Sequence, residues 1–275
     1  MIAVDIGGTH SRAALFDGDR IAWRASVATP AQEGPQAVVG AVTELLAPWH
    51  QEAILPIGVA VAGFVVGGSV TAHHGLRGWQ AFPLADALRE RLQRPVAIFN
   101  DARAAAWGEY RRGAGQGCRE FCFVTVSTGV GAGLVLDGRL HLARNGLDAE
   151  LGETLAVDGR TLEDHASGAA LTRRAQALGH ANASALCDAA DAGDPQAEAA
   201  LRQAVGALAE KLADLSVLLG VARTAVGGGL GLRPGYLARL RGALRTWPAL
   251  YQHELVPAAL GADAGLHGVA DLLAA

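Results

Sequence analysis

The chain has 275 residues with 23 basic and 27 acidic side chains, a net charge of −4, and 51% hydrophobic residues. This composition can fill a sizeable core, which excludes a disordered chain, and the length allows one large domain or two. The well-mixed charge argues against a nucleic-acid surface or a polybasic membrane patch.

Strand and helix patterns alternate along the chain, which predicts an α/β class. In the first part we predict strands within residues 1–27 with turns at 7–8 and 17–19, a helix over 36–49, a strand over 57–62, a hairpin turn at 67–68, a helix over 84–92 and a strand that ends near 101. In the second part we predict a helix over 103–110, a Gly-rich break at 113–117, strands over 121–127 and 132–136, an acid-rich loop region at 139–165, a helix from 195 to 219, a strand over 224–226 and helices over 236–247 and 262–273.

The cysteines Cys118, Cys122 and Cys187 are odd in number, and no pair has Cys-x-x-Cys spacing. We therefore expect free thiols, a reducing compartment and a cytoplasmic location. Asp5 follows Met1 too closely for the apolar core of a signal peptide.

Residues 53–76 contain no Asp, Glu, Lys or Arg, and this stretch is long enough to span a membrane. A proline and several glycines interrupt it, however, so a buried strand followed by a turn is the preferred interpretation. We expect no membrane association.

Asn100 and Asp101 lie where the strand that ends with Ile98 and Phe99 meets an alanine-rich helix. In open α/β sheets, ligands bind outside the carboxyl ends of the strands. Two interpretations of Asp101 are open at this point: a helix N-cap that accepts backbone N–H bonds, or a functional carboxylate.

Two copies of one pattern flank this junction. Residues 3–18 and 124–138 each consist of a strand, a Gly/Thr turn, a second strand and an Asp-Gly turn, and the closing turns lie 120 positions apart (137 − 17). Such glycine turns leave backbone N–H groups accessible, as phosphate binding requires. One turn is a weak signal, but two in register with an acid between them predict a nucleotide held between two related half-folds.

These motifs, together with Gly227-Gly228-Gly229, resemble the ROK family of sugar kinases within the actin, hexokinase and chaperone-ATPase superfamily. The resemblance covers nearly the whole chain, and local runs such as residues 100–107 are most similar to bacterial N-acetylmannosamine kinases. It implies a two-lobed actin/hexokinase-like (ribonuclease H-like) α/β fold with a central cleft, and a homodimer. The small N-terminal lobe would hold residues 1–112, with the last helix (262–275) packed back on it, and the large lobe residues 113–261.

The resemblance implies ATP-dependent phosphorylation of a sugar hydroxyl, expected to be O6, with N-acetylmannosamine as the first choice and glucose or another hexosamine as alternatives. Asp101 would accept the hydroxyl proton as the catalytic base. Asp5 would hold Mg²⁺ through water, although it could also serve only to stabilise a turn. The residues expected to bind ATP are Asp5, Gly7, Gly8, Thr9, Thr128, Gly129, Gly131, Gly227 and Gly228.

Six residues are expected to bind the sugar: Gly63, Asn100, Asp101, Glu150, Glu153 and Glu163. Carboxylates suit this role because they can accept hydrogen bonds from two neighbouring hydroxyls. For each glutamate, a solvated surface acid is the alternative.

The chain departs from the family pattern at three places. Glu153 stands where the family has a histidine that touches sugar and zinc, and Gly75 stands where it has a sugar-contacting asparagine. The run that matches the cysteine-rich zinc loop, residues 156–162, contains no cysteine. Because a tetrahedral zinc site of this kind needs thiolates, we predict no structural zinc. None of the nine histidines has metal-like spacing with a cysteine, and we interpret them as structural or surface residues.

Two other classes of function compete with a kinase. The family includes sugar-responsive repressors, which carry a helix-turn-helix domain ahead of the first phosphate motif. That motif begins at Asp5 here, so we expect no such domain and no nucleic-acid partner. The other class is a catalytically inactive sugar-binding protein, and the presence of Asp101 with both glycine turns argues against it.

Overall fold

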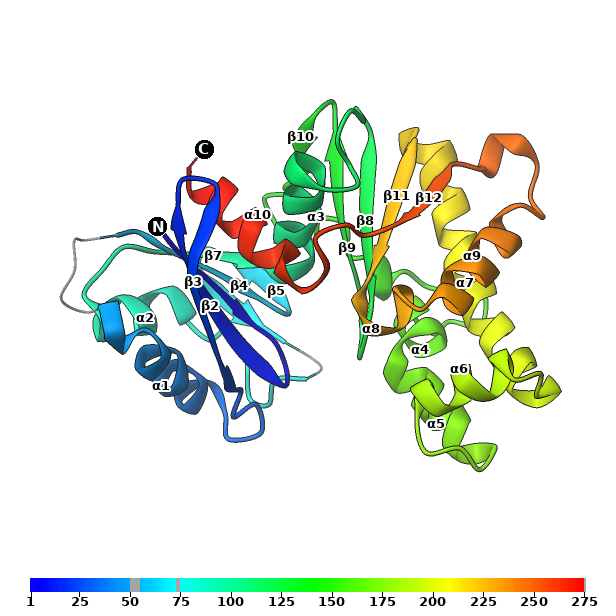
Figure 1. Cartoon of the computed structure of the whole chain (residues 1–275), viewed down its shortest axis with the longest axis horizontal. Helices are drawn as coiled ribbons and strands as arrows, with labels where there is room; N and C mark the ends of the chain where they lie inside the picture. Colours follow the sequence, from blue (N-terminus) through cyan, green and yellow to red (C-terminus); the bar gives the residue numbers. More distant parts are fainter. Residues whose placement is uncertain (50–54, 73–74, 275) are drawn as a thin grey trace. The chain divides into compact units, whose positions relative to one another are not determined.

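The computed structural model describes residues 1–49, 55–72 and 75–274, and the chain divides into two compact units (Figure 1). Unit 1 comprises Met1–Gly108, Leu142–Asp148 and Ala262–Ala275, and unit 2 comprises Glu109–His141 and Ala149–Gly261. Residues 142–148, predicted to lie in the large lobe, belong to unit 1. The physical reason is Arg103 of unit 1, which donates hydrogen bonds to the carbonyls of Gly146 and Asp148.

Unit 1 is built on a five-stranded sheet with the order β3-β2-β1-β4-β7. Its strands are β1 (Ile2–Ile6), β2 (His10–Asp17), β3 (Arg20–Ala28), β4 (Ile57–Val61) and β7 (Val96–Asn100). Strands β1 to β3 are antiparallel to one another, while β4 and β7 run parallel to β1 and to each other. Val61 is paired with both Ile6 and Asn100, so the carboxyl ends of β1, β4 and β7 lie at one edge of the sheet.

The two faces of this sheet bury different helices, because successive side chains of a strand point to opposite faces. Ile2 and Val4 belong to the apolar cluster formed with α1 (Pro35–Leu45) and α2 (Leu84–Leu92). Ala3 belongs to the cluster formed with Leu266 and Val269 of α10 (Ala264–Leu273). Asp5 shares the face of Ala3 and lies beside α10, where a Cβ placed on Gly265 would be 3.6 Å from its carboxyl group.

Unit 2 repeats the layout of unit 1, with a five-stranded sheet in the order β10-β9-β8-β11-β12. Its strands are β8 (Phe121–Val126), β9 (Val130–Leu136), β10 (Arg139–Leu140), β11 (Arg223–Gly227) and β12 (Glu254–Pro257). Three strands are again antiparallel, and two further strands run parallel to the hairpin's first strand. The internal repeat therefore extends from the hairpins detected in the sequence to the whole sheet.

The longest helix of unit 2 begins and ends where the sequence predicts. In α7 (Pro195–Leu219), the Asp194 carboxylate accepts hydrogen bonds from the N–H groups of Gln196 and Ala197. The helix ends at Gly220, which adopts a left-handed conformation with φ 64°. The other helices of this unit are α4 (Leu162–Ala166), α5 (Gly168–Ala177), α6 (Ala183–Asp191), α8 (Gly228–Gly231) and α9 (Pro234–Leu244). Figure 1 shows α7 and α9 beside β11 and β12, with α4, α5 and α6 below them in this view.

Several elements differ from their predicted bounds. The helix predicted over 36–49 ends at Leu45, and a separate 3-10 turn (Ala47–Trp49) follows because Pro48 cannot donate a backbone hydrogen bond. The predicted loop region 139–165 contains β10, a 3-10 turn (Leu151–Glu153) and the start of α4. Helices α5 and α6 and strand β12 were not predicted, and the hairpin turn at 67–68 joins β5 (Phe64–Val66) to β6 (Ser69–Thr71). No helix in the described part of the chain has both the length and the apolar character to cross a membrane.

Helices α3 (Asp101–Arg112) and α10 touch through glycine. A Cβ placed on Gly268 would lie 1.6 Å from the carbonyl oxygen of Ala104. Gly206, in the interior of α7, has nothing within 4 Å of such a Cβ. The contrast separates a glycine that is required by packing from one that only weakens its helix.

We predict that Gly268→Ala lowers the free energy of unfolding by about 2–3 kcal/mol, because the two helices must move apart. Gly206→Ala should instead raise it by about 0.5–1 kcal/mol, because alanine favours the helix more than glycine does. Urea unfolding followed by circular dichroism measures both. Equal effects of the two substitutions would contradict the packing assigned to α3 and α10.

Candidate active site

The junction of β7 and α3 is organised by Asn100. Its side-chain oxygen accepts a hydrogen bond from the N–H of Arg103 at 3.0 Å, which caps the first turn of α3. Its amide nitrogen donates to the carbonyl of Gly63 at 3.0 Å. Asn100 is therefore the residue that caps the helix. The interpretation of Asp101 as the helix N-cap is wrong. The Asp101 carboxylate accepts a hydrogen bond from the N–H of Ala102 at 2.8 Å.

Asp101 is the one of three neighbouring carboxylates in unit 1 that lacks a cation. Asp5 pairs with Arg12 at 2.6 Å, and Asp148 pairs with Arg103 at 2.7 Å. No Lys, Arg or His side chain of the described residues pairs with Asp101. Burial, and secondly the negative charge of Asp5, raise the pKa of Asp101 to about 6. A carboxyl group with this pKa can take up and release a proton near neutral pH.

Asp5 lies near the end of β1, directly before the first glycine turn. Burial raises its pKa, and the charge of Arg12 and the hydrogen bond from it act in the opposite direction. The pairing could have been read from the sequence, since the hairpin register places Asp5 opposite Arg12. Arg12 was not predicted as a partner of Asp5, because the glycine turn alone does not show the register of the two strands that it joins.

The first glycine turn presents its backbone to solvent. The N–H of Gly7 donates to the carbonyl of His10 at 3.1 Å and closes the turn. Gly8 and Thr9 are exposed, and within the described part of the chain their N–H groups have no acceptor. Available N–H groups of this kind suit an anion such as phosphate.

The second glycine turn, in unit 2, is held by Glu163. The Glu163 carboxylate accepts a hydrogen bond from the N–H of Val130 at 2.8 Å. A Cβ on Gly129 would lie 2.5 Å from the same carboxylate oxygen, so a larger residue at 129 would displace the Glu163 side chain. Thr128 is exposed, and its carbonyl accepts a hydrogen bond from the N–H of Ala169. Glu163, predicted as a sugar ligand, thus also fixes the shape of a predicted phosphate turn.

Two further glycines predicted to bind ATP, Gly227 at the end of β11 and Gly228 directly after it, pack closely. Gly228 has φ 83°, and a Cβ on it would lie 2.4 Å from the carbonyl oxygen of Val126. A Cβ on Gly227 would lie 2.8 Å from the ring of Phe123. Packing alone requires both glycines, and it places their turn beside the carboxyl end of β8, where the second glycine turn begins. Gly131 lies in β9, paired with Thr125 of β8.

Glu150 and Glu153 bracket a 3-10 turn that lies against the second hairpin. A Cβ on Gly152, in the middle of this turn, would be 2.3 Å from the carbonyl oxygen of Val130 and 3.6 Å from the Glu163 carboxylate. Glu153 is exposed and Glu150 is half-buried. Unit 2 therefore places the turn that carries Glu150 and Glu153 against Val130, whose N–H donates to Glu163.

The segment that matches the family's zinc loop forms a short hairpin, bridged between Leu155 and Thr161. The Asp158 carboxylate accepts hydrogen bonds from the backbone and side chain of Arg160 and lies 3.1 Å from the ring of His165. These contacts lower the pKa of Asp158 to about 2.

Within the described ranges, no group of three or more His, Cys, Asp or Glu side chains could hold a metal ion. The absence of a structural zinc stays a prediction. The histidines at positions 50, 73 and 74, interpreted as structural or surface residues, lie outside the described residues.

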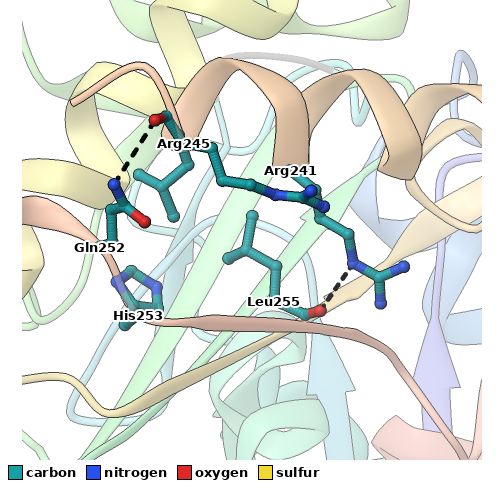
Figure 2. Close-up of a pocket in the computed structure, with 6 residues that line it drawn as sticks. Arg241, Arg245, Gln252, His253 and Leu255 are labelled. Carbon is teal, nitrogen blue, oxygen red and sulfur yellow. Dashed lines mark hydrogen bonds between the residues drawn. The ribbon is translucent and has the colours of Figure 1, made fainter. Parts of the chain in front are cut away.

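A separate hollow of about 180 Å³ in unit 2 contains none of the predicted site residues (Figure 2). His253 lies at its wall, with Ser216 and Thr224 hydroxyls 2.6 and 2.7 Å from its two ring nitrogens. Burial lowers the pKa of His253 to about 4, so the ring is neutral at pH 7. Thr224 lies near the start of β11 and Gly227 at its end, so the hollow and the glycine turns are associated with opposite ends of that strand.

We predict that Asp101→Asn stabilises the folded protein at pH 7–8. The folded-state pKa of about 6 lies above the value of about 3.9 in an unfolded chain, so ionisation of Asp101 lowers stability as the pH rises through this interval. Asparagine avoids that cost, and the gain should be about 1–2 kcal/mol at pH 7.5, after allowance for the partial exposure of the side chain. Urea unfolding at pH 7.5 and at pH 4 measures it. The gain should vanish at pH 4, and an equal gain at both values would contradict the assigned cause.

Comparison with known proteins places the chain in a family. The ROK family profile matches residues 1–275. An N-acetylmannosamine kinase of Escherichia coli O1:K1 / APEC is 37% identical over 282 residues, covering 98% of this chain and 96% of that protein. A bifunctional enzyme NanE/NanK of Brucella melitensis is 39% identical over 280 residues, covering 100% of this chain and 54% of that enzyme, so the chain spans about half of its length.

Among solved structures, a ROK family glucokinase from Streptomyces griseus in complex with glucose and AMPPNP has 32% sequence identity and a TM-score of 0.84, with 98% of each chain covered. A ROK hexokinase from Thermus thermophilus has 34% identity and a TM-score of 0.82, covering 98% of this chain and 96% of that one. These matches confirm the predicted α/β fold of the actin/hexokinase-like class. The chain belongs to the ROK family.

Proposed function

We propose that the protein phosphorylates a sugar hydroxyl, O6, with ATP. The observation that carries this proposal is Asp101, a half-buried carboxylate without a cation, whose pKa is raised to about 6. It follows β7 at the sheet edge where β1 ends and the first glycine turn begins. The names of the full-length relatives, N-acetylmannosamine kinase and glucokinase, support the same reaction class.

The proposed substrate is N-acetylmannosamine. The support is the Escherichia coli relative of that name, which this chain matches over almost its whole length. Glucose is the second candidate, because the similar Streptomyces griseus structure contains glucose. The chain departs from the family pattern at Gly75 and Glu153, two positions expected to contact the sugar. The assay below therefore compares both sugars.

In the proposed mechanism, Asp101 accepts the proton of the sugar hydroxyl as its oxygen attacks the γ-phosphorus of ATP. An alcohol is a weak nucleophile, and a positioned base near its proton accelerates the transfer. Above pH 6 Asp101 is largely ionised and can act as this base. Asn100 supports the step by capping α3, since that cap fixes the first helical residue, Asp101 itself.

We propose that the N–H and hydroxyl groups of both glycine turns bind the phosphates of ATP. The residues are Gly7, Gly8 and Thr9 of unit 1 and Thr128, Gly129 and Gly131 of unit 2, with Gly227 and Gly228 beside the nucleoside. Asp5 fits an outer role toward Mg²⁺, because its charge and that of Asp101 repel each other and a divalent cation would offset both. Such an ion would supply charge neutralisation at the phosphates.

For the sugar we propose Asn100, Glu150, Glu153 and Glu163, together with the backbone of Gly63. The turn that carries Glu150 and Glu153 packs on Val130, to which Glu163 is hydrogen-bonded, and carboxylates can accept hydrogen bonds from vicinal hydroxyls. Glu163 would serve both reactants, since it also holds the second glycine turn.

The remaining proposals concern location and assembly. We propose a cytoplasmic protein, supported by Cys118, Cys122 and Cys187, all of which are free thiols. The proposed homodimer rests on the family resemblance alone.

A coupled assay of ADP release with a panel of hexoses and hexosamines tests the proposed function. We expect turnover to be fastest with N-acetylmannosamine, and kcat/KM to fall below pH 6 as Asp101 becomes protonated. Asp101→Asn should reduce kcat about 10²–10⁴-fold, because asparagine cannot accept the proton.

The matched outcomes separate the alternatives. If calorimetry detects sugar binding but no sugar in the panel gives ADP release, the protein is a non-catalytic sugar-binding protein. Turnover with Asp101→Asn close to that of the wild type would remove Asp101 as the base.

Two glutamate variants test how the binding residues divide between the substrates. Glu153→Gln should raise the KM for the sugar about 10-fold and leave the KM for ATP within about 2-fold, because Glu153 is exposed and holds no part of a glycine turn. Glu163→Ala should raise the KM for the sugar and the KM for ATP. The N–H of Val130 loses its acceptor, so the second glycine turn, which is proposed to bind ATP, is no longer held in shape. Initial-rate kinetics with each substrate varied measure this. An effect of Glu153→Gln confined to ATP would exclude it from the sugar site.

A further inference from the structure

Arg103 is a buried cation of unit 1 with several hydrogen-bond partners, and the proposed mechanism does not use it. It lies in the first turn of α3 and is 5% exposed. Its Nε is 2.7 Å from a carboxylate oxygen of Asp148 and 2.9 Å from the Asp148 carbonyl. Its terminal nitrogen donates to the carbonyl of Gly146 at 2.8 Å. The loop Leu142–Asp148 is thereby fixed to the helix that carries Asp101.

These contacts close a ring around the start of α3. The Asn100 side chain joins the N–H of Arg103 to the carbonyl of Gly63. Gly63 leads directly into β5, and Gly146 packs on β5, since a Cβ on Gly146 would lie 2.6 Å from the Val66 side chain. The ring therefore runs from Gly63 through Asn100 and Arg103 to Gly146 and back to β5. Asp101 is attached to it through its neighbours in sequence.

The electrostatic arrangement gives Arg103 a second effect. The charge of Arg103 acts on Asp101 in the direction that lowers its pKa, against burial and the charge of Asp5. The adjacent Asp148 carboxylate offsets part of the Arg103 charge, and both side chains are shielded from solvent, with exposed fractions of 6% and 2%. The two charges therefore act on Asp101 with opposite signs.

We propose that Arg103 and Asp148 form a positioning pair for phosphate transfer: Arg103 holds the loop Leu142–Asp148 against the base-bearing helix, and the balance of their charges acts on the Asp101 carboxylate. The proposal rests on the proposed function and adds two residues to which the sequence motifs assign no role. Arg103 and Asp148 act through Asp101 and do not contact the reactants themselves.

The pH dependence of kcat/KM distinguishes this role from a merely structural one. Arg103→Gln should move the acidic midpoint upward by about 0.5–1 pH unit, because the positive charge that favours the ionised form of Asp101 is lost. Asp148→Asn should move it downward, because the Arg103 charge is then no longer offset. The double variant should return to within about 0.3 pH unit of the wild type.

Two controls keep the test specific. Arg144→Gln removes a positive charge from the same loop, but Arg144 is exposed, so screening should leave the midpoint unchanged. Arg103→Lys keeps the charge but loses the planar fork, so the midpoint should stay in place while kcat falls about 10-fold. Thermal unfolding of each variant confirms that it is folded. Should Arg103→Gln not fold, Asp148→Asn and Arg103→Lys carry the test.

Shifts of the same sign in Arg103→Gln and Asp148→Asn, or no shift in Asp148→Asn, would overturn the positioning role. That result is distinct from failure of the proposed function, which would appear as no ADP release by the wild type or as undiminished turnover by Asp101→Asn.

Discussion

In unit 1, Arg12 pairs with Asp5 and Arg103 pairs with Asp148, and Asp101 is left without a cation. Ion pairing favours the charged form of a carboxylate, while burial and a neighbouring negative charge favour the protonated form. Burial and the negative charge of Asp5 both act on Asp101, no ion pair cancels them, and the pKa of Asp101 rises to about 6. The chemistry proposed for the protein depends on this uneven distribution of two guanidinium groups among three carboxylates.

The repeated sheet explains where the glycine turns lie. Each unit has three antiparallel strands followed by two parallel ones, and each glycine turn joins the first two strands of its sheet. The repeat is not chemically symmetric. Asp101 follows the last parallel strand of unit 1, whereas Ala258 follows the last parallel strand of unit 2. Both repeats therefore offer a turn suited to phosphate, and only the first adds a carboxylate at the corresponding position.

Glycines in these motifs serve different physical purposes. Gly228 is required by close packing and by its positive φ, since a Cβ on it would lie 2.4 Å from the backbone oxygen of Val126. A Cβ on Gly8 would meet its nearest neighbour, the carbonyl of Gly75, at an ordinary 3.5 Å. Packing therefore does not account for glycine at position 8, whereas the proposed contact of its backbone with a phosphate would.

Local signals in the sequence determined the fold class, the bounds of α2 and α7, and the positions of both glycine turns and the β7–α3 junction. Those features depend on residues close together in the chain, such as Asp194, Pro195 and Gly220 around α7. Tertiary structure alone decided that Asn100 rather than Asp101 caps α3, and that Arg103 pairs with Asp148, 45 positions away. It also placed Glu163 against Val130. Contacts between distant segments have no periodicity or spacing that a single sequence displays, and they determine the charge environment of Asp101.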